Sequence, residues 1–315
     1  MQIIAATAPV VPTAGMAIHD DAAPTPAGAT PLELTLPAGR IRGLRWGRAG
    51  GRPVLAVHGW LDNAASFDFL APRLCRALDL DLVAIDLPGH GLSDWSGRGY
   101  APASQAGALL QVLDALGWQR ADLVGHSLGA SLATLLAAAV PERVRSLCCL
   151  DALGGPAANL ADCVPRLRRH LLASFAHPLP EPRPLDNLEL GIAARQRANG
   201  LGREAASALA SRGMQLREGH WHWRSDPALT LPSAFYLEEA QVQALLAALQ
   251  VPTLVVVASD GPLQQSPQRL AQRRACLPPQ ASVINLAGGH HLHMEHAASV
   301  APHVLTLLTE TAPGP

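Results

Sequence analysis

Short apolar runs alternate with amphipathic stretches along most of the 315-residue chain. The runs PVLAV (53–57), LDLVAI (80–85) and ADLVGH (121–126) are mostly apolar and short, which is typical of buried parallel strands. Residues 104–117 instead place leucine and valine at i, i+3, i+4 and i+7 before a terminal glycine, which predicts an amphipathic helix. This alternation predicts an α/β fold with a mostly parallel central sheet flanked by helices.

The beginning of the chain departs from this pattern. Residues 1–30 are rich in alanine, proline and threonine without periodicity, so we expect a mobile N-terminal tail. The sequence leaves open whether translation starts at Met1 or at Met16. Residues 32–47 alternate in polarity around the turn sequence PAGR, which predicts an antiparallel hairpin.

A second departure lies in the middle of the chain. The alternation of strands and helices stops near Gly154, and the segment that follows is rich in arginine, alanine and proline and helical in places. We therefore expect one α/β core in two parts, residues 31–154 and 233–315, with a helical cap inserted at residues 155–232. Ten arginines fall in the insertion, and we interpret them as a solvated helix surface.

The charge balance excludes some classes of partner. The chain has 24 basic and 25 acidic residues, so no overall field attracts nucleic acid or an anionic membrane. There is neither a secretory leader pattern nor an apolar segment long enough to span a bilayer, so we expect a cytoplasmic protein without membrane association. The cysteines show no metal or disulfide spacing, and we expect reduced core residues: Cys75, Cys148, Cys149, Cys163 and Cys276.

Ser127 is the candidate nucleophile. It lies in the pattern G-x-S-x-G, between Gly125 and Gly129, where a predicted strand meets a predicted helix. Flanking glycines let strand and helix approach at a sharp turn, and free N–H groups at the helix N-terminus stabilise an oxyanion.

A serine nucleophile needs a base, and His290 follows the last predicted strand on the same rim of the sheet. His291 and His293 are its rivals. Together with His296 they form a cluster that suggests a metal, but acidic and cysteine ligands are missing nearby. We therefore expect neither a metal nor a cofactor.

Four segments together resemble the α/β-hydrolase superfamily, over about residues 32–310: HGWLDNAASFDFLAPRL (58–74), AIDLPGHGLSD (84–94), LVGHSLGASLATLLAAAVPERV (123–144) and GGHHLHMEH (288–296). HGWLDNAASF and WHWRSDP (221–227) resemble its serine hydrolase-like branch. The resemblance implies Ser127 as nucleophile and favours His290 over His291 as base. It also implies an oxyanion hole formed by the backbone N–H groups of Trp60 and Leu128, and a cap that lies over the rim as a lid.

The acid of the implied triad has two candidates. In the superfamily it usually follows the strand written here PTLVVVASDGP, which offers Asp260, but the usual spacing falls on Gly261. Asp151 follows the preceding strand, at the alternative position that some members of the superfamily use. We place Asp151 slightly ahead of Asp260.

The pocket is less defined by the sequence. We expect substrate contacts from Trp60, His126, Trp221 and Trp223, the last two sharing one face of an extended segment. The resemblance implies a carboxylesterase-like serine hydrolase that cleaves an ester, thioester or amide of a small to medium apolar acyl group. A non-catalytic ligand receptor and an acyltransferase on the same fold are the alternatives.

Overall fold

The computed structural model describes residues 23–96, 99–175, 179 and 182–311. Its core is an eight-stranded sheet in the order β1-β2-β4-β3-β5-β6-β9-β10. The strands are β1 (Ala29–Leu36), β2 (Gly39–Gly47), β3 (Arg52–Val57), β4 (Leu80–Ile85), β5 (Ala121–His126), β6 (Val144–Leu150), β9 (Thr253–Ala258) and β10 (Ala281–Leu286). β2 runs antiparallel to both of its neighbours, β1 and β4, whereas the six strands from β4 to β10 in this order run parallel to one another. The predicted α/β fold is confirmed.

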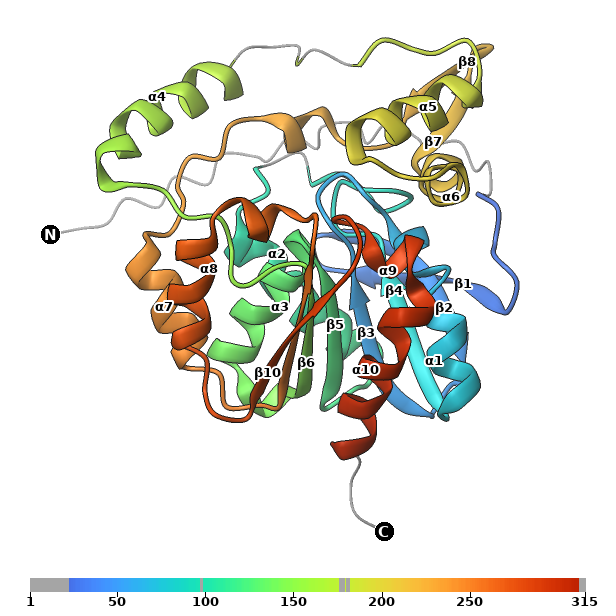
Figure 1. Ribbon diagram of the computed structural model, residues 1–315. Coiled ribbons are helices and arrows are strands. Elements are labelled where there is room, and N and C mark those ends of the chain that lie inside the picture. Colours follow the sequence, from blue (N-terminus) through green and yellow to red (C-terminus); the bar gives the residue numbers. More distant parts are fainter. Residues whose placement is uncertain (1–22, 97–98, 176–178, 180–181, 312–315) are drawn as a thin grey trace, which may run out of the picture.

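Helices cover both faces of the sheet (Figure 1). One face carries α2 (Pro102–Ala115), α3 (Leu128–Ala139) and α7 (Glu239–Ala247), with α8 (Pro267–Ala275) beside them; the other carries α1 (Ala71–Ala77) and α10 (Ala297–Glu310), which α9 (Leu292–Glu295) precedes. Successive residues of β3 alternate between the two layers, so Leu55 and Val57 pack on one side and Val54 and Ala56 on the other. Burial on both faces explains why the central strands are almost wholly apolar.

The structure confirms the predicted N-terminal hairpin but shortens the predicted tail. The predicted hairpin is confirmed, because β1 pairs with β2 from Ala29 opposite Trp46 to Leu36 opposite Gly39. The predicted mobile tail extends too far, since its last two residues already belong to β1. Residues 1–22 of that tail lie outside the described residues.

The cysteines are free, but they are not all core residues. Cys148 and Cys149 are buried in β6, whereas Cys163 is exposed at the start of α4 (Cys163–Ser174), so the expectation of a core position is wrong there. Burial raises the pKa of the Cys149 thiol to about 12, which keeps it in the unreactive thiol form. No helix in the described part of the chain is long and apolar enough to cross a bilayer.

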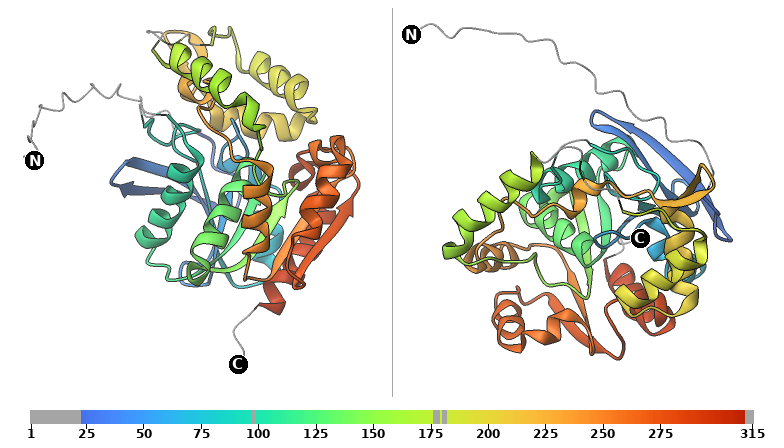
Figure 2. Two further views of the ribbon diagram at one scale, coloured as in Figure 1. Left: turned by 90° about the vertical axis from the view of Figure 1, so that its left-hand side faces the viewer. Right: turned by 90° about the horizontal axis from the view of Figure 1, so that it is seen from above.

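Most of the described residues between β6 and α7 form a layer above the sheet (Figures 1 and 2). It contains α4, α5 (Leu188–Asn199), α6 (Arg203–Gly213) and a two-stranded hairpin, β7 (Met214–Arg217) with β8 (His220–Trp223). Ile192, Leu209 and Met214 belong to an apolar cluster of this layer. The layer therefore contains a hairpin as well as helices, whereas we expected a helical cap from the sequence.

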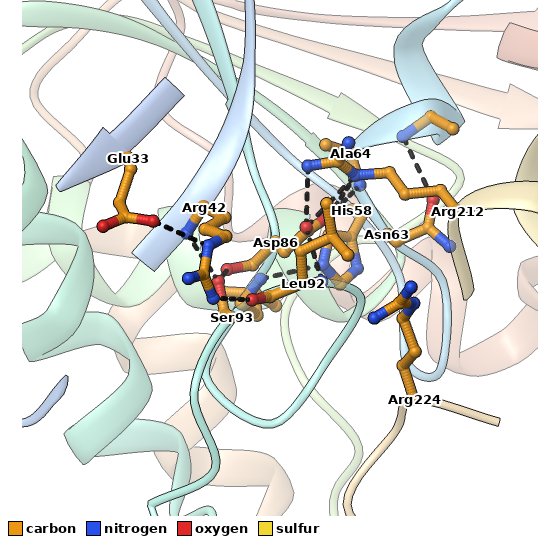
Figure 3. A network of polar contacts seen from close by, with 12 residues as sticks. Glu33, Arg42, His58, Asn63, Ala64, Asp86, Leu92, Ser93, Arg212 and Arg224 are labelled. Atoms are coloured by element: carbon orange, nitrogen blue, oxygen red, sulfur yellow. Dashed lines mark hydrogen bonds and ion pairs between the residues drawn. The ribbon is translucent and has the colours of Figure 1, made fainter. Parts of the chain in front are cut away.

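A buried ion pair fastens this layer to the core (Figure 3). Arg212 of α6 donates from Nη2 to Asp86 Oδ2 at 2.8 Å and from Nε to both carboxylate oxygens, and both side chains are almost fully buried. Asp86 also accepts hydrogen bonds from the backbone N–H groups of Ala64 and Leu92. Although burial opposes ionisation, Arg212 and these N–H groups hold the pKa of Asp86 below its usual value.

Replacing Arg212 with methionine should lower the free energy of unfolding by about 3–5 kcal/mol, because it leaves the Asp86 carboxylate buried and unpaired. Urea denaturation measures the change. Arg203→Met is the matched control on the same helix, since its ion pair with Glu189 is exposed and worth about 1 kcal/mol or less. Equal losses in the two variants would contradict the assigned role of the buried pair.

Candidate active site

Ser127 lies at the sharp turn between β5 and α3. Its backbone has φ 51° and ψ −114°, in the positive-φ region that costs energy for a residue with a Cβ. A Cβ at Gly125 would lie 2.5 Å from the backbone of Ala130, and one at Gly129 would lie 2.0 Å from the carbonyl oxygen of Val57. The motif therefore needs glycine at both flanks so that α3 can approach β5 and β3.

His290 connects Ser127 to Asp151. His290 Nε2 lies 2.9 Å from Ser127 Oγ, and His290 Nδ1 lies 2.7 Å from Asp151 Oδ2. Asp151 is buried at the end of β6, and its other oxygen accepts a hydrogen bond from the Ala258 N–H at 3.0 Å. A carboxylate at Nδ1 keeps the hydrogen of a neutral imidazole on that nitrogen, so Nε2 is left to accept the serine proton.

Among the described residues, no hydrogen bond or ion pair joins Asp260, the other candidate acid, to His290. The Asp260 side chain is exposed, and its Oδ2 accepts a hydrogen bond from Ser259 Oγ at 3.0 Å. At Gly261, a Cβ would lie 2.2 Å from Asp151 Oδ2. The Asp151 carboxylate thus fills the space that a side chain at position 261 would enter.

The two N–H groups expected in the oxyanion hole belong to segments that approach each other at Gly129. Leu128 is the first residue of α3, and N–H groups in a first helical turn have no acceptor within the helix. The loop that carries Trp60 is held by His58, which accepts from the Leu87 N–H at 3.0 Å and donates to the Gly59 carbonyl oxygen at 2.7 Å. Burial lowers the pKa of His58, which favours the neutral ring that these two bonds require.

The expected pocket residues lie at different depths. Trp60 is 53% exposed, and its indole Nε1 donates to the Leu229 carbonyl oxygen of the upper layer at 3.1 Å. Trp221 and Trp223 pack against the apolar cluster of that layer. Among the described residues, no hydrogen bond, ion pair or ring contact joins either of them to the Ser127–His290 pair. The Trp60 indole therefore lies where the core meets the upper layer.

The other histidines form a buried group beside His290. His126 donates from Nε2 to the His290 carbonyl oxygen at 2.9 Å, and its ring centroid lies 4.6 Å from that of His290. Burial lowers the pKa of His126 to about 4, so its ring is neutral at pH 7. His291 Nε2 lies 3.0 Å from Asp62 Oδ2, and His293 Nε2 lies 2.7 Å from Ser66 Oγ. The ring nitrogens of His291 and His293 that form these contacts are therefore bonded to side chains other than Ser127.

Asp62 is a site residue that the sequence reasoning missed. It is 2% exposed and lies beside His126, His291 and Arg195. Burial raises the pKa of its carboxyl, but the two neighbouring imidazoles and the charge of Arg195 outweigh it and hold the pKa well below the usual value. Its position two residues after Trp60, in the segment that resembles the oxyanion loop, was the available signal.

Three arginines of the upper layer are not part of a solvated surface. Arg212 and Arg224 are buried, and the Arg195 side chain is 11% exposed. Arg195 lies 3.4 Å from Asp62 Oδ1, and Arg224 donates from Nε to the Met214 carbonyl oxygen. Our interpretation of the insertion's arginines as solvated is wrong for these three.

Comparisons with known proteins agree with this architecture. The family model described as the alpha/beta hydrolase fold matches residues 52–297. A serine hydrolase-like protein of Danio rerio is 28% identical over 295 residues, covering 90% of each chain. A hypothetical protein of Pseudomonas aeruginosa superposes with a TM-score of 0.83 at 35% identity, over 89% of this chain and 99% of that one. The thioesterase domain from the curacin biosynthetic pathway superposes with a TM-score of 0.77 at 27% identity, over 88% and 99%. The chain is a hydrolase that belongs to the α/β-hydrolase family, in the branch of the serine hydrolase-like proteins.

Proposed function

We propose that this hydrolase is a carboxylesterase-like enzyme that cleaves an ester or thioester of a small to medium apolar acyl group through an acyl-enzyme on Ser127. The observation that carries the proposal is the continuous path of contacts from Ser127 Oγ to His290 Nε2 at 2.9 Å and from His290 Nδ1 to Asp151 Oδ2 at 2.7 Å. The resemblance to a thioesterase domain supports including thioesters.

In the proposed mechanism, Ser127 Oγ attacks the carbonyl carbon while His290 Nε2 takes the serine proton. The backbone N–H groups of Trp60 and Leu128 stabilise the oxyanion. Asp151 holds the imidazole in the required tautomer and stabilises the imidazolium. His290 then gives the proton to the leaving alcohol or thiol, and the C–O or C–S bond breaks. In the second half, His290 takes a proton from water, whose oxygen attacks the acyl carbon. The bond between that carbon and Ser127 Oγ then breaks, His290 returns the proton to Oγ, and the carboxylic acid leaves.

The test is turnover of a series of p-nitrophenyl esters with acetyl, butyryl and octanoyl groups, measured by release of p-nitrophenol. We expect hydrolysis that depends on Ser127. If the protein binds an ester analogue but hydrolyses no member of the series, the result would favour a ligand receptor on the same fold.

A further inference from the structure

Three buried side chains beside the proposed triad point their polar atoms at one another. They are Asp62 after β3, His126 at the end of β5 and His291 after β10, and each is at most 4% exposed. Asp62 Oδ2 lies 3.0 Å from His291 Nε2 and 3.5 Å from His126 Nδ1. One ligand atom from each residue lies within 4.8 Å of the other two. The fold thereby supplies the acidic ligand that the sequence around the histidines lacks.

The hydrogen bonding of His126 leaves one of these atoms without a partner. His126 Nε2 lies 2.9 Å from the His290 carbonyl oxygen, which only accepts hydrogen bonds, so Nε2 carries the hydrogen of a neutral ring. His126 Nδ1 then has a lone pair that faces the Asp62 carboxylate. This nitrogen is buried and has no hydrogen-bond partner among the described residues. Two facing acceptors repel each other, and a cation between them would remove the repulsion.

The spacing fits a small divalent cation. In a tetrahedral zinc site, bonds of about 2.0–2.1 Å to nitrogen and oxygen separate neighbouring ligand atoms by about 3.3 Å. The separations of 3.0 and 3.5 Å at Asp62 Oδ2 lie on either side of this value. Two imidazoles and one carboxylate suit zinc and related transition-metal ions. We propose that Asp62, His126 and His291 form a binding site for a divalent transition-metal ion.

Binding of the ion would leave each of the two imidazole rings with one hydrogen. The ion would form bonds to His126 Nδ1, His291 Nε2 and Asp62 Oδ2 and lose the water molecules that these atoms replace. His291 keeps one hydrogen, which moves from Nε2 to Nδ1, and His126 keeps its hydrogen on Nε2. Binding therefore releases no net proton from the two rings.

Arg195 opposes binding at this site. Its Nη1 lies 3.4 Å from Asp62 Oδ1, the carboxylate oxygen that is not one of the three proposed ligand atoms, and its Nη2 donates to the Leu61 carbonyl oxygen. The guanidinium already offsets the carboxylate charge and repels a second cation. Arg195 comes from α5, so the upper layer contributes to the charge beside the site. His126 and His291 adjoin Ser127 and His290, so an occupied site is expected to change turnover.

Isothermal titration calorimetry with zinc chloride on the full-length, chelator-stripped protein tests the proposal without using activity. We expect one zinc site per chain, weakened at least about tenfold by Asp62→Asn and tightened about tenfold by Arg195→Met. Two controls should leave the affinity unchanged: His220→Gln, which removes an exposed histidine of β8, and His290→Ala, which removes the imidazole of the proposed triad.

Several results would overturn the proposal. These are absence of zinc binding in the parent protein, parental affinity in folded Asp62→Asn, and loss of the site in His290→Ala, which would move the ion to the triad. Circular dichroism establishes folding. If Asp62→Asn does not fold, Arg195→Met decides, because unchanged or weaker zinc binding in that variant contradicts the site.

Discussion

Replacing Ser127 with alanine should lower ester hydrolysis about 10³- to 10⁶-fold while leaving the fold intact. The substitution removes the oxygen that lies 2.9 Å from His290 Nε2 and little volume. It also relieves none of the φ 51° strain, since alanine keeps the Cβ. Initial rates of p-nitrophenyl butyrate hydrolysis, with circular dichroism as a check of folding, measure the effect.

Ser131→Ala is the matched control for this variant. Ser131 lies one turn further along α3, and its hydroxyl donates to backbone carbonyl oxygens of Ser127 and Gly154. We expect its activity to stay within about tenfold of the parent, because it takes no part in the proposed proton transfer. Parental activity in Ser127→Ala would show that the serine at the turn is not the nucleophile.

Replacing Asp151 with asparagine should lower turnover about 10⁴-fold, because an amide can donate to His290 Nδ1 and stabilise the wrong tautomer. Asp151 Oδ2 lies 2.7 Å from that nitrogen. The same change at Asp260 should cost about tenfold or less, since this exposed carboxylate contacts Ser259. Values of kcat for the two variants, side by side, measure the difference.

The reverse ranking, with Asp260→Asn the more damaging, would return the acid to the end of β9. A large loss in both variants would point to a requirement for charge near the rim rather than to one orienting carboxylate. The stability of Asp151→Asn is measured alongside, because Asp151 also accepts from the Ala258 N–H.

The core of the fold could be predicted because its physical causes are local. Strands buried on both faces read as short apolar runs, such as β3 and β9, and amphipathic helices such as α2 show their spacing directly. The upper layer could not be predicted in the same way, because its local sequence patterns are too short. Its hairpin β7–β8 has only four residues in each strand, too few for a reliable alternation.

The site could be predicted in part. Ser127 and His290 stand in motifs whose local context is visible in the sequence, and the strand order that brings them to one rim follows from the fold. The choice between Asp151 and Asp260 depends on which carboxylate fills the space beside Gly261, and that is a property of tertiary packing. Asp62 and His291 meet across 229 positions of the sequence, which no spacing argument detects.

The most direct measurement of the central claim, that Ser127 is an activated nucleophile, is covalent labelling with a fluorophosphonate followed by mass-spectrometric mapping of the modified peptide. Only an activated serine attacks this phosphorus at an appreciable rate. We expect one adduct per chain, on Ser127, and none in a folded His290→Ala variant. An adduct on another residue, or no adduct on the folded parent protein, would contradict the claim.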